Sequence, residues 1–313
     1  IVIDTSFSVL FNSLTFYNQN QLVTIDGKLS KNSNDKLDVF IQNFKLAQLN
    51  PFLKDSQFTI DGTLTGNTSV FGAFGKPILS SDNHFKDLKL NNKLIGYGEV
   101  KTEYNPEKDL ISIDGFSAFA KDFDGNLMKN IVFSGSYYPK RKDENIDIKF
   151  KAEPFDLSLL QPFLKDILTF KIGYLNGNGT VTGTLDNPQI NAKLKFFKCV
   201  MIVDFLNVQY SVSGTVDIMP KQINFENLEI RDKVGNSGSV YGNIFHNNFK
   251  DMRIDFDINT NKLMVLNTTS ANNPAYYGTA YASGNAGIYG FLDDIKMELN
   301  MKTNGGTYFY IPL

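Results

Sequence analysis

The sequence predicts an all-β protein, an elongated and curled antiparallel sheet that forms a groove and is built from about three repeats, with one or two short amphipathic helices. Three observations support this prediction: stretches in which apolar and polar residues alternate, Asx-Gly pairs between them, and a recurring motif. Alternation with a period of two gives a strand one dry and one wet face, which is typical of an antiparallel sheet with one face in water.

The alternation is clearest in four stretches, and we expect their apolar members to line the dry face of the sheet. Polar residues such as Asp147, Lys149 and Lys296 fill the intervening positions. At about 8–12 residues for each strand with its turn, the chain would hold roughly 25–35 strands. The apolar members are Ile146, Ile148 and Phe150; Ile190, Leu194 and Phe196; Ile254, Phe256 and Ile258; and Ile295, Met297, Leu299 and Met301.

Asx-Gly pairs suit tight hairpin turns because both residues tolerate a positive φ. We therefore expect turns at five places. They are Asp26-Gly27, Asp61-Gly62, Asp114-Gly115, Asp124-Gly125 and Asn304-Gly305-Gly306.

A motif recurs along the chain. Pro51-Phe52-Leu53-Lys54-Asp55 returns as Pro162-Phe163-Leu164-Lys165-Asp166 at an offset of 111 residues, and the glycines that follow keep this spacing. A weaker third copy places Gly284 at an offset of 107 from Gly177. We expect one continuous fragment of a longer protein over residues 1–313, with approximate repeats 1–105, 106–217 and 218–313.

A short helix interrupts the strands in each of the first two repeats. Apolar residues with helical spacing follow residue 156, and Pro162 suits a first turn. The equivalent stretch in the first repeat is Leu46 to Leu53, and we expect both helices to lie against the sheet. The spaced residues are Leu157, Leu160, Leu164, Ile167 and Leu168.

The composition excludes several classes of function. The formal net charge of −2 argues against a nucleic-acid binder, which needs a basic face. One cysteine, Cys199, rules out an internal disulfide framework, and two histidines, His84 and His246, leave little for a metal site or a catalytic triad. No acid–base pair stands out, so we predict no enzyme and no cofactor. No apolar run reaches the ~20 residues that cross a bilayer, and we find no signal peptide.

An antiparallel sheet with one apolar face must cover that face. It can pack against a second sheet, close into a barrel, or curl partway and leave a groove suited to acyl chains. Alternation alone does not separate a filled core from a trough lined for lipid.

The C-terminal part of the chain carries a series of short glycine- and aromatic-containing motifs. They are Arg231-Asp232-Lys233-Val234-Gly235-Asn236, Val240-Tyr241-Gly242-Asn243-Ile244-Phe245-His246, Ile254-Asp255-Phe256, Tyr277-Gly278-Thr279-Ala280, Ile288-Tyr289-Gly290 and Thr307-Tyr308-Phe309-Tyr310-Ile311-Pro312-Leu313. This part of the chain resembles the C-terminal region of TamB, the translocation and assembly module of the AsmA-like group of bridge-type lipid-transfer proteins. The resemblance is densest from about residue 220 onward, and the recurring proline motifs resemble the family's repeats.

The resemblance implies a β-taco whose apolar groove carries phospholipid acyl chains between inner and outer membranes, in the periplasm of a diderm bacterium, in support of outer-membrane biogenesis. It implies phospholipids and a BamA-like outer-membrane barrel protein of the TamA type as partners, and an N-terminal inner-membrane anchor that this chain lacks. The family has no catalytic residues to transfer. An alternative is a scaffold or chaperone for outer-membrane barrels that pairs through strand edges. A third is an adhesive β-repeat protein with a packed core and no lipid.

Overall fold

A computed structural model of the chain describes residues 2–3, 8–54, 59–121, 123–164, 167–248 and 250–312. The described residues form 20 strands and three short 3-10 helices, which confirms the predicted all-β, antiparallel fold. The strands are fewer than the roughly 25–35 expected from short strands, because several are long: β17 (Lys250–Thr268) has 19 residues. The chain divides into two compact units, residues 1–151 with 180–186 and residues 152–179 with 187–313.

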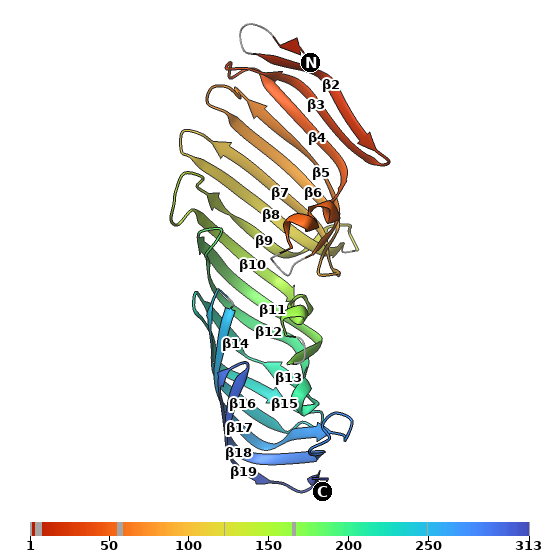
Figure 1. The fold of residues 1–313 in the computed structure, drawn as a ribbon, viewed down its shortest axis with the longest axis vertical. Helices are drawn as coiled ribbons and strands as arrows, with labels where there is room; N and C mark the ends of the chain where they lie inside the picture. Colours follow the sequence, from red (N-terminus) through yellow and green to blue (C-terminus); the bar gives the residue numbers. More distant parts are fainter. Residues whose placement is uncertain are drawn as a thin grey trace. The chain divides into compact units, whose positions relative to one another are not determined.

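The first unit is a meander. From β2 to β9 each strand pairs antiparallel with the next strand of the chain, and Figure 1 shows them side by side in that order. β1 pairs with β2. The elements are β1 (Val2–Ile3), β2 (Val9–Asn18), β3 (Gln21–Leu29), β4 (Lys36–Lys45), η1 (Leu46–Phe52), β5 (Ile60–Phe71), β6 (Ile78–Leu90), β7 (Lys93–Asn105), β8 (Leu110–Lys121) and β9 (Leu127–Tyr137), and both units contain residues of β10 (Ile146–Asp156) and β11 (Leu168–Gly183).

In the first unit, β-bulges keep apolar side chains on one face of the sheet where the alternation of apolar and polar residues in the sequence is interrupted. Ser13 in β2, Asn43 in β4 and Asp87 in β6 each have a positive φ at a point where the strand register shifts. In β4, Ile41 and Phe44 are three positions apart, yet both pair across the bulge in the β4–β5 ladder. The extra residue bends the strand and returns Phe44 to the face that Ile41 occupies.

Three of the predicted hairpin turns are wrong. Asp26-Gly27, Asp61-Gly62 and Asp114-Gly115 lie inside β3, β5 and β8. Gly27 has a φ of 108°, and a Cβ there would stand 2.2 Å from the carbonyl oxygen of Lys36 in the next strand. Glycine at this position permits close approach of two strands rather than a turn. The turns predicted at Asp124-Gly125 and Asn304-Gly305-Gly306 are confirmed.

The two predicted helices are present as 3-10 helices of seven residues, η1 and η2 (Leu157–Phe163), which begin at the 111-residue offset of the recurring motif. η2 is as short as expected: it ends at Phe163, and Leu168, the last residue with helical spacing, begins β11. The expectation that Pro162 lies in a first turn is wrong, because Pro162 is the second-last residue of η2. Asp55, Lys165 and Asp166 of the motif lie outside the described residues.

η2 is anchored at its first residue. The carboxylate of Asp156 accepts a hydrogen bond of 2.8 Å from the amide of Ser158 and caps the helix. Leu157 is buried, and its Cδ1 would stand 3.0 Å from a Cβ placed on Gly173 in β11. The Sγ of Cys199 lies on the same side of Gly173, 3.3 Å from that point. A glycine at 173 therefore leaves the space that the leucine of the helix fills.

The second unit continues the antiparallel pattern. β13 and β14 both pair with β12, as one strand interrupted at Gly214, whose φ is 134°. From β14 to β19 each strand pairs with the next (Figure 1). β20 pairs with the start of β18. The further elements are β12 (Pro188–Val203), η3 (Asp204–Leu206), β13 (Val208–Ser213), β14 (Thr215–Met219), β15 (Gln222–Arg231), β16 (Ser237–Asn247), β18 (Tyr277–Phe291), β19 (Asp294–Thr303) and β20 (Tyr308–Tyr310).

Candidate functional site

One face of the second unit is a continuous apolar surface, which the strand registers reveal. Directly opposed residues of an antiparallel pair share a face, so a row can be followed from strand to strand. One row crosses seven strands, from β12 to β19, without a polar side chain. Its members are Ala192, Ile218, Ile223, Ile244, Ile254, Gly290 and Ile295.

Two further rows lie beside the first on β15 to β19. Phe225 and Phe256 pack across Gly242 with ring centroids 5.6 Å apart, in space that a side chain on the glycine would fill. The predicted Met301 lies opposite Gly284 on the same face. The rows are Phe225, Gly242, Phe256, Ile288 and Met297, and Leu228, Val240, Ile258, Ala286 and Leu299.

The predicted residues of β12 also lie on this face. Leu194 is opposite Val216 in β14, one step along the strand from Ala192 in the first row. Ile190 and Phe196 share this side of β12 by alternation, since the bulge at Lys198 comes after them. The structure therefore places all ten predicted residues of the second unit on one apolar surface.

The apolar surface becomes accessible toward β19. Ile254 in β17 is 9% exposed, whereas Ile295, Met297 and Leu299 in β19 are 47%, 55% and 64% exposed. Within the described residues β19 has a strand partner only on its β18 side. The exposed fraction of the apolar side chains is thus highest along β19.

The other three predicted residues belong to the first unit. Ile146 is buried, Ile148 and Phe150 are half-buried, and the intervening Asp147 and Lys149 are exposed. Alternation along β10 places the three apolar side chains on one side of the strand, as predicted from their spacing.

The corresponding face of the first unit carries a polar patch that the alternation did not reveal. Thr68, Ser81 and Thr102 lie opposite one another on β5, β6 and β7, between apolar neighbours. The hydroxyls of Ser81 and Thr102 are 2.9 Å apart, and the amide of Asn83 donates to Ser81 at 3.0 Å. The three residues are far apart in the sequence, so the alternation along each strand did not show that they lie opposite one another.

A buried carboxylate holds the tip of the β15–β16 hairpin in the second unit. Asp232 accepts hydrogen bonds from the backbone amides of Val234, Asn236 and Met264, and from the side chain of Asn236, at 2.9–3.0 Å. Burial alone would raise the pKa of Asp232, but these hydrogen bonds outweigh it and hold the pKa below its usual value. Burial and the nearby Asp232 carboxylate raise the pKa of Tyr210.

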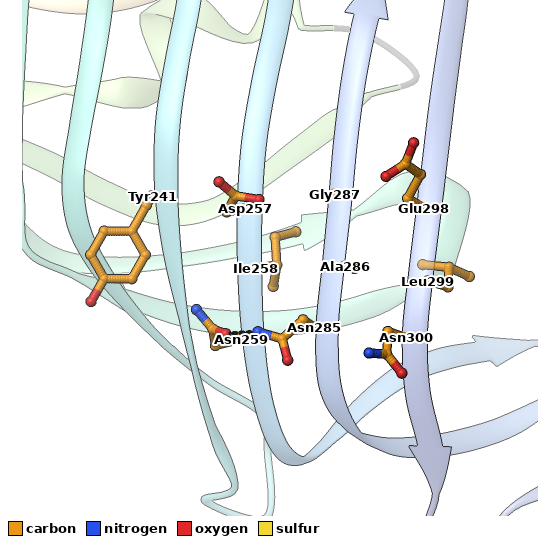
Figure 2. Close-up of a pocket in the computed structure, with 10 residues that line it drawn as sticks. All are labelled: Tyr241, Asp257, Ile258, Asn259, Asn285, Ala286, Gly287, Glu298, Leu299 and Asn300. Atoms are coloured by element: carbon orange, nitrogen blue, oxygen red, sulfur yellow. Dashed lines mark hydrogen bonds between the residues drawn. The ribbon is translucent and has the colours of Figure 1, made fainter.

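A hollow of about 550 Å³ lies on β16 to β19, and Figure 2 shows ten residues that line it. Its polar lining includes Asp257 and Glu298, on either side of Gly287 in register, and Asn285, which donates a hydrogen bond to Asn259. Glu298 also accepts the hydroxyl of Tyr289 at 2.6 Å. The lining also includes Ile258, Ala286 and Leu299 of the third apolar row, so the hollow combines polar and apolar residues.

The part of the chain that the structure describes holds no group of three or more His, Cys, Asp or Glu residues that could bind a metal ion. None of its helices has the length and apolar character needed to cross a membrane. His84 lies on an exposed strand face. Its Nε2 is 3.2 Å from Oδ1 of Asp82, and its Nδ1 is 3.6 Å from Oε2 of Glu99.

Comparison with known families gives one match. Residues 226–313 match the family model of the TamB C-terminal domain. Neither the curated proteins nor the solved structures contain a match. The resemblance indicated by the sequence motifs is thereby confirmed over β16 to β20, strands that include β19, where the apolar side chains are most exposed.

Proposed function

We propose that this chain, which carries a TamB C-terminal domain over residues 226–313, is a segment of a periplasmic lipid conduit. Phospholipid acyl chains would lie along the apolar surface of the second unit, while their head groups stay in water beside β19. The family match supports a role in the TamB system of outer-membrane assembly. TamB proteins span the periplasm of diderm bacteria as non-enzymatic transport and assembly modules.

The single observation that supports the conduit best is the apolar row from Ala192 to Ile295, which crosses seven strands. An acyl chain needs continuous apolar contact and few hydrogen bonds, and each methylene removed from water contributes about 0.8 kcal/mol. A row without polar side chains lets a chain slide without meeting a group that must first lose its water.

Photo-crosslinking tests the conduit directly. A photoreactive amino acid at Met297 should capture phospholipid from protein expressed in a diderm bacterium, whereas the same residue at Lys296 should not. These neighbours lie on opposite faces of one exposed strand, which makes them a matched pair. Native mass spectrometry of detergent-free protein should find co-purified phospholipid. Equal crosslinking at both positions, with no bound lipid, would refute the conduit.

A second candidate function is a scaffold for outer-membrane barrel assembly through strand-edge pairing with a BamA-like partner. The observation that favours it is the edge of β19, whose backbone groups on one side have no strand partner within the described residues. Such an edge can accept an added strand. This function predicts that proline at an outward-facing amide of β19 abolishes partner binding, while the polarity of Met297 has no effect.

A further inference from the structure

One end of the second unit carries aromatic rings on both faces of the sheet. β20 pairs with the start of β18, where Tyr310 is opposite Tyr277 and Phe309 is opposite Gly278. By alternation, Tyr277, Tyr308 and Tyr310 lie on the polar face, and Phe309 lies on the apolar face. Ring centroids are 5.2 Å apart for Tyr277 and Tyr310, and 5.8 Å for Tyr276 and Phe309. We call Tyr276, Tyr277, Tyr308, Phe309, Tyr310 and Ile311 the aromatic tip.

The aromatic tip leaves much apolar surface in water. Tyr308, Phe309 and Tyr310 are each half or more exposed, and Ile311 is 67% exposed. Stacking fixes the rings against one another, so they form a preformed patch. The hydroxyl of Tyr308 also accepts a hydrogen bond of 3.0 Å from Thr279, which holds the ring over β18.

The strands around the aromatic tip lack charge. No Asp, Glu, Lys, Arg or His occurs between Lys262 and Asp293, or after Lys302, although 20% of the chain is charged. This covers the end of β17, the loop 269–276, all of β18 and all of β20. Strand faces that are exposed to water normally carry charged residues. Earlier in β17, Asp255 and Asp257 are two such exposed charged residues.

Two lysines border the uncharged region. The amide of Lys262 donates to the hydroxyl of Ser283 at 2.9 Å, and Lys302 lies opposite Ser283 in the β18–β19 ladder. Both lysines are exposed. Thr279 is the strand partner of Tyr308. Ser283 is four residues further along β18, so the two positions are about 13 Å apart along the strand. Positive charge thus lies next to the uncharged aromatic tip, on the side toward the rest of the unit.

We propose that the aromatic tip binds the interfacial region of a phospholipid membrane, with Lys262 and Lys302 facing the phosphate groups. Tyrosine rings favour this region because one end of the ring is apolar and the hydroxyl stays wet. Lysine side chains extend along an apolar surface and keep the ammonium group at the phosphate layer. The inference goes beyond the lipid conduit and does not depend on it, because three of the rings lie on the face opposite the apolar rows.

The arrangement favours a membrane over a protein partner. Rings on both faces of one sheet end suit a medium that surrounds that end, whereas a protein docked on one face would leave the other rings in water. The absence of charge fits the region just below the phosphates, where a charged side chain is costly. The bordering lysines match the anionic lipid phosphates in sign.

A fluorescence experiment tests this contact, because the chain has no tryptophan. Tyr308→Trp places a single fluorophore in the aromatic tip, and Tyr17→Trp places one at a position that is 82% exposed in the first unit. With vesicles of phosphatidylcholine and phosphatidylglycerol, the Tyr308→Trp emission should shift to the blue and be quenched by lipids brominated near the acyl carbonyls. The Tyr17→Trp emission should stay unchanged.

Three results would overturn the proposal. They are an unchanged Tyr308→Trp emission at saturating vesicles, an equal shift for Tyr17→Trp, and a shift that appears only when the vesicles contain a barrel protein. The last result would assign the tip to a protein partner.

Substitution of the two lysines tests whether they contact the lipid phosphate groups. Lys262→Gln and Lys302→Gln should each weaken binding to the anionic vesicles about fivefold at low salt. The loss should shrink in high salt, and neither variant should change the circular dichroism spectrum. Binding that is unchanged in the double variant would refute the phosphate contact.

The tip and the conduit can fail independently. A Met297→Glu variant should lose co-purified phospholipid and still bind vesicles through the tip. A Tyr308→Ser, Phe309→Ser, Tyr310→Ser variant should keep co-purified phospholipid and lose at least about tenfold in vesicle binding, since each buried ring contributes more than a methylene. Should β20 unfold in that variant, the single-tryptophan proteins still decide the matter because they keep every ring aromatic.

Discussion

The hydroxyl of Tyr210 in β13 donates a hydrogen bond of 2.7 Å to the carbonyl oxygen of Met264 in β17, although β15 and β16 separate these strands in the ladder. The contact forms because β17 extends past the start of β16, which pairs only as far as Asn261. The amide of Met264 donates to Asp232 at the hairpin tip. Two side chains thus bind the backbone N–H and C=O of one residue of β17, Met264, and join strands across the end of the hairpin.

Tyr210→Phe should destabilise the second unit while leaving its strand pairing intact. The ring still fills its buried site, but the carbonyl of Met264 loses its side-chain partner in a place with little water. An unsatisfied buried acceptor costs about 1–3 kcal/mol. Urea unfolding followed by circular dichroism measures the effect, with Tyr241→Phe on the exposed face of β16 as the control. An unchanged urea midpoint would show that the contact carries no stability.

Asp232 should make the second unit sensitive to acid. Its pKa is lower in the folded chain than in the unfolded chain, so the carboxylate contributes stability above about pH 4, the ordinary value of the group. That stability is lost as the pH falls through the lower, folded-state pKa. Asp232→Asn cannot accept the same set of amide hydrogens, so it should be less stable at neutral pH and change less between neutral and acid pH. Urea midpoints across pH, compared for the two proteins, measure this.

Alternation located most of the strands and the face on which their apolar residues lie, since it reflects which face of a strand meets water. Ile254, Phe256 and Ile258 were placed correctly because nothing interrupts the period of two between them. Asp26-Gly27 was misplaced because a glycine with positive φ serves a close strand contact as well as a turn. The bulge at Lys262 carries no sequence signal, since a lysine at positive φ looks like any exposed lysine.

Contacts between distant strands were beyond the reach of local patterns. The bond between Tyr210 and Met264 depends on how far β17 extends past its neighbour, which is set by the register of several strands together. The polar patch of Ser81 and Thr102 also escaped, because its effect depends on the two residues being opposite each other. The apolar rows could be predicted strand by strand, but not the order in which the strands join them.

Gly284 and Gly287 in β18 should differ sharply in their tolerance of alanine. Gly284 has a φ of 137°, and a Cβ there would stand 2.3 Å from the carbonyl oxygen of Asn300. At Gly287 the nearest neighbour of a Cβ is the Cβ of Glu298 at 3.9 Å. Gly284→Ala should destabilise the unit by about 1–3 kcal/mol, and Gly287→Ala should change stability by less than about 1 kcal/mol. Equal urea midpoints for the two variants would contradict this close strand contact.

Cys199 should be protected from alkylation in the folded chain. It is 2% exposed, and burial raises the pKa of its thiol to about 11. At pH 8 only on the order of one thiol in a thousand is then ionised, and the thiolate is the reactive form. Iodoacetamide labelling followed by mass spectrometry should be slow in buffer and fast in urea. Because the chain has one cysteine, the labelling rate reports unfolding of the second unit alone.

Met297→Glu should empty the lipid site, whereas Lys296→Glu should not. Met297 belongs to an apolar row with Ile288 and Phe256, and it is 55% exposed, so a carboxylate there does not have to be buried in the folded protein. An acyl chain lying on this row would strip water from the new charge, which is costly. The phospholipid that co-purifies per protein chain should therefore fall at least about tenfold for Met297→Glu, the effect of roughly 1.4 kcal/mol.

Lys296→Glu reverses a charge on the opposite face of the same strand, where no acyl chain is expected, and should keep its phospholipid. Quantitative native mass spectrometry, with urea midpoints to verify folding, separates loss of lipid from loss of structure. Equal lipid content in the two variants would mean that hydrocarbon does not lie on this face, and the strand-edge scaffold would become the better account of the molecule.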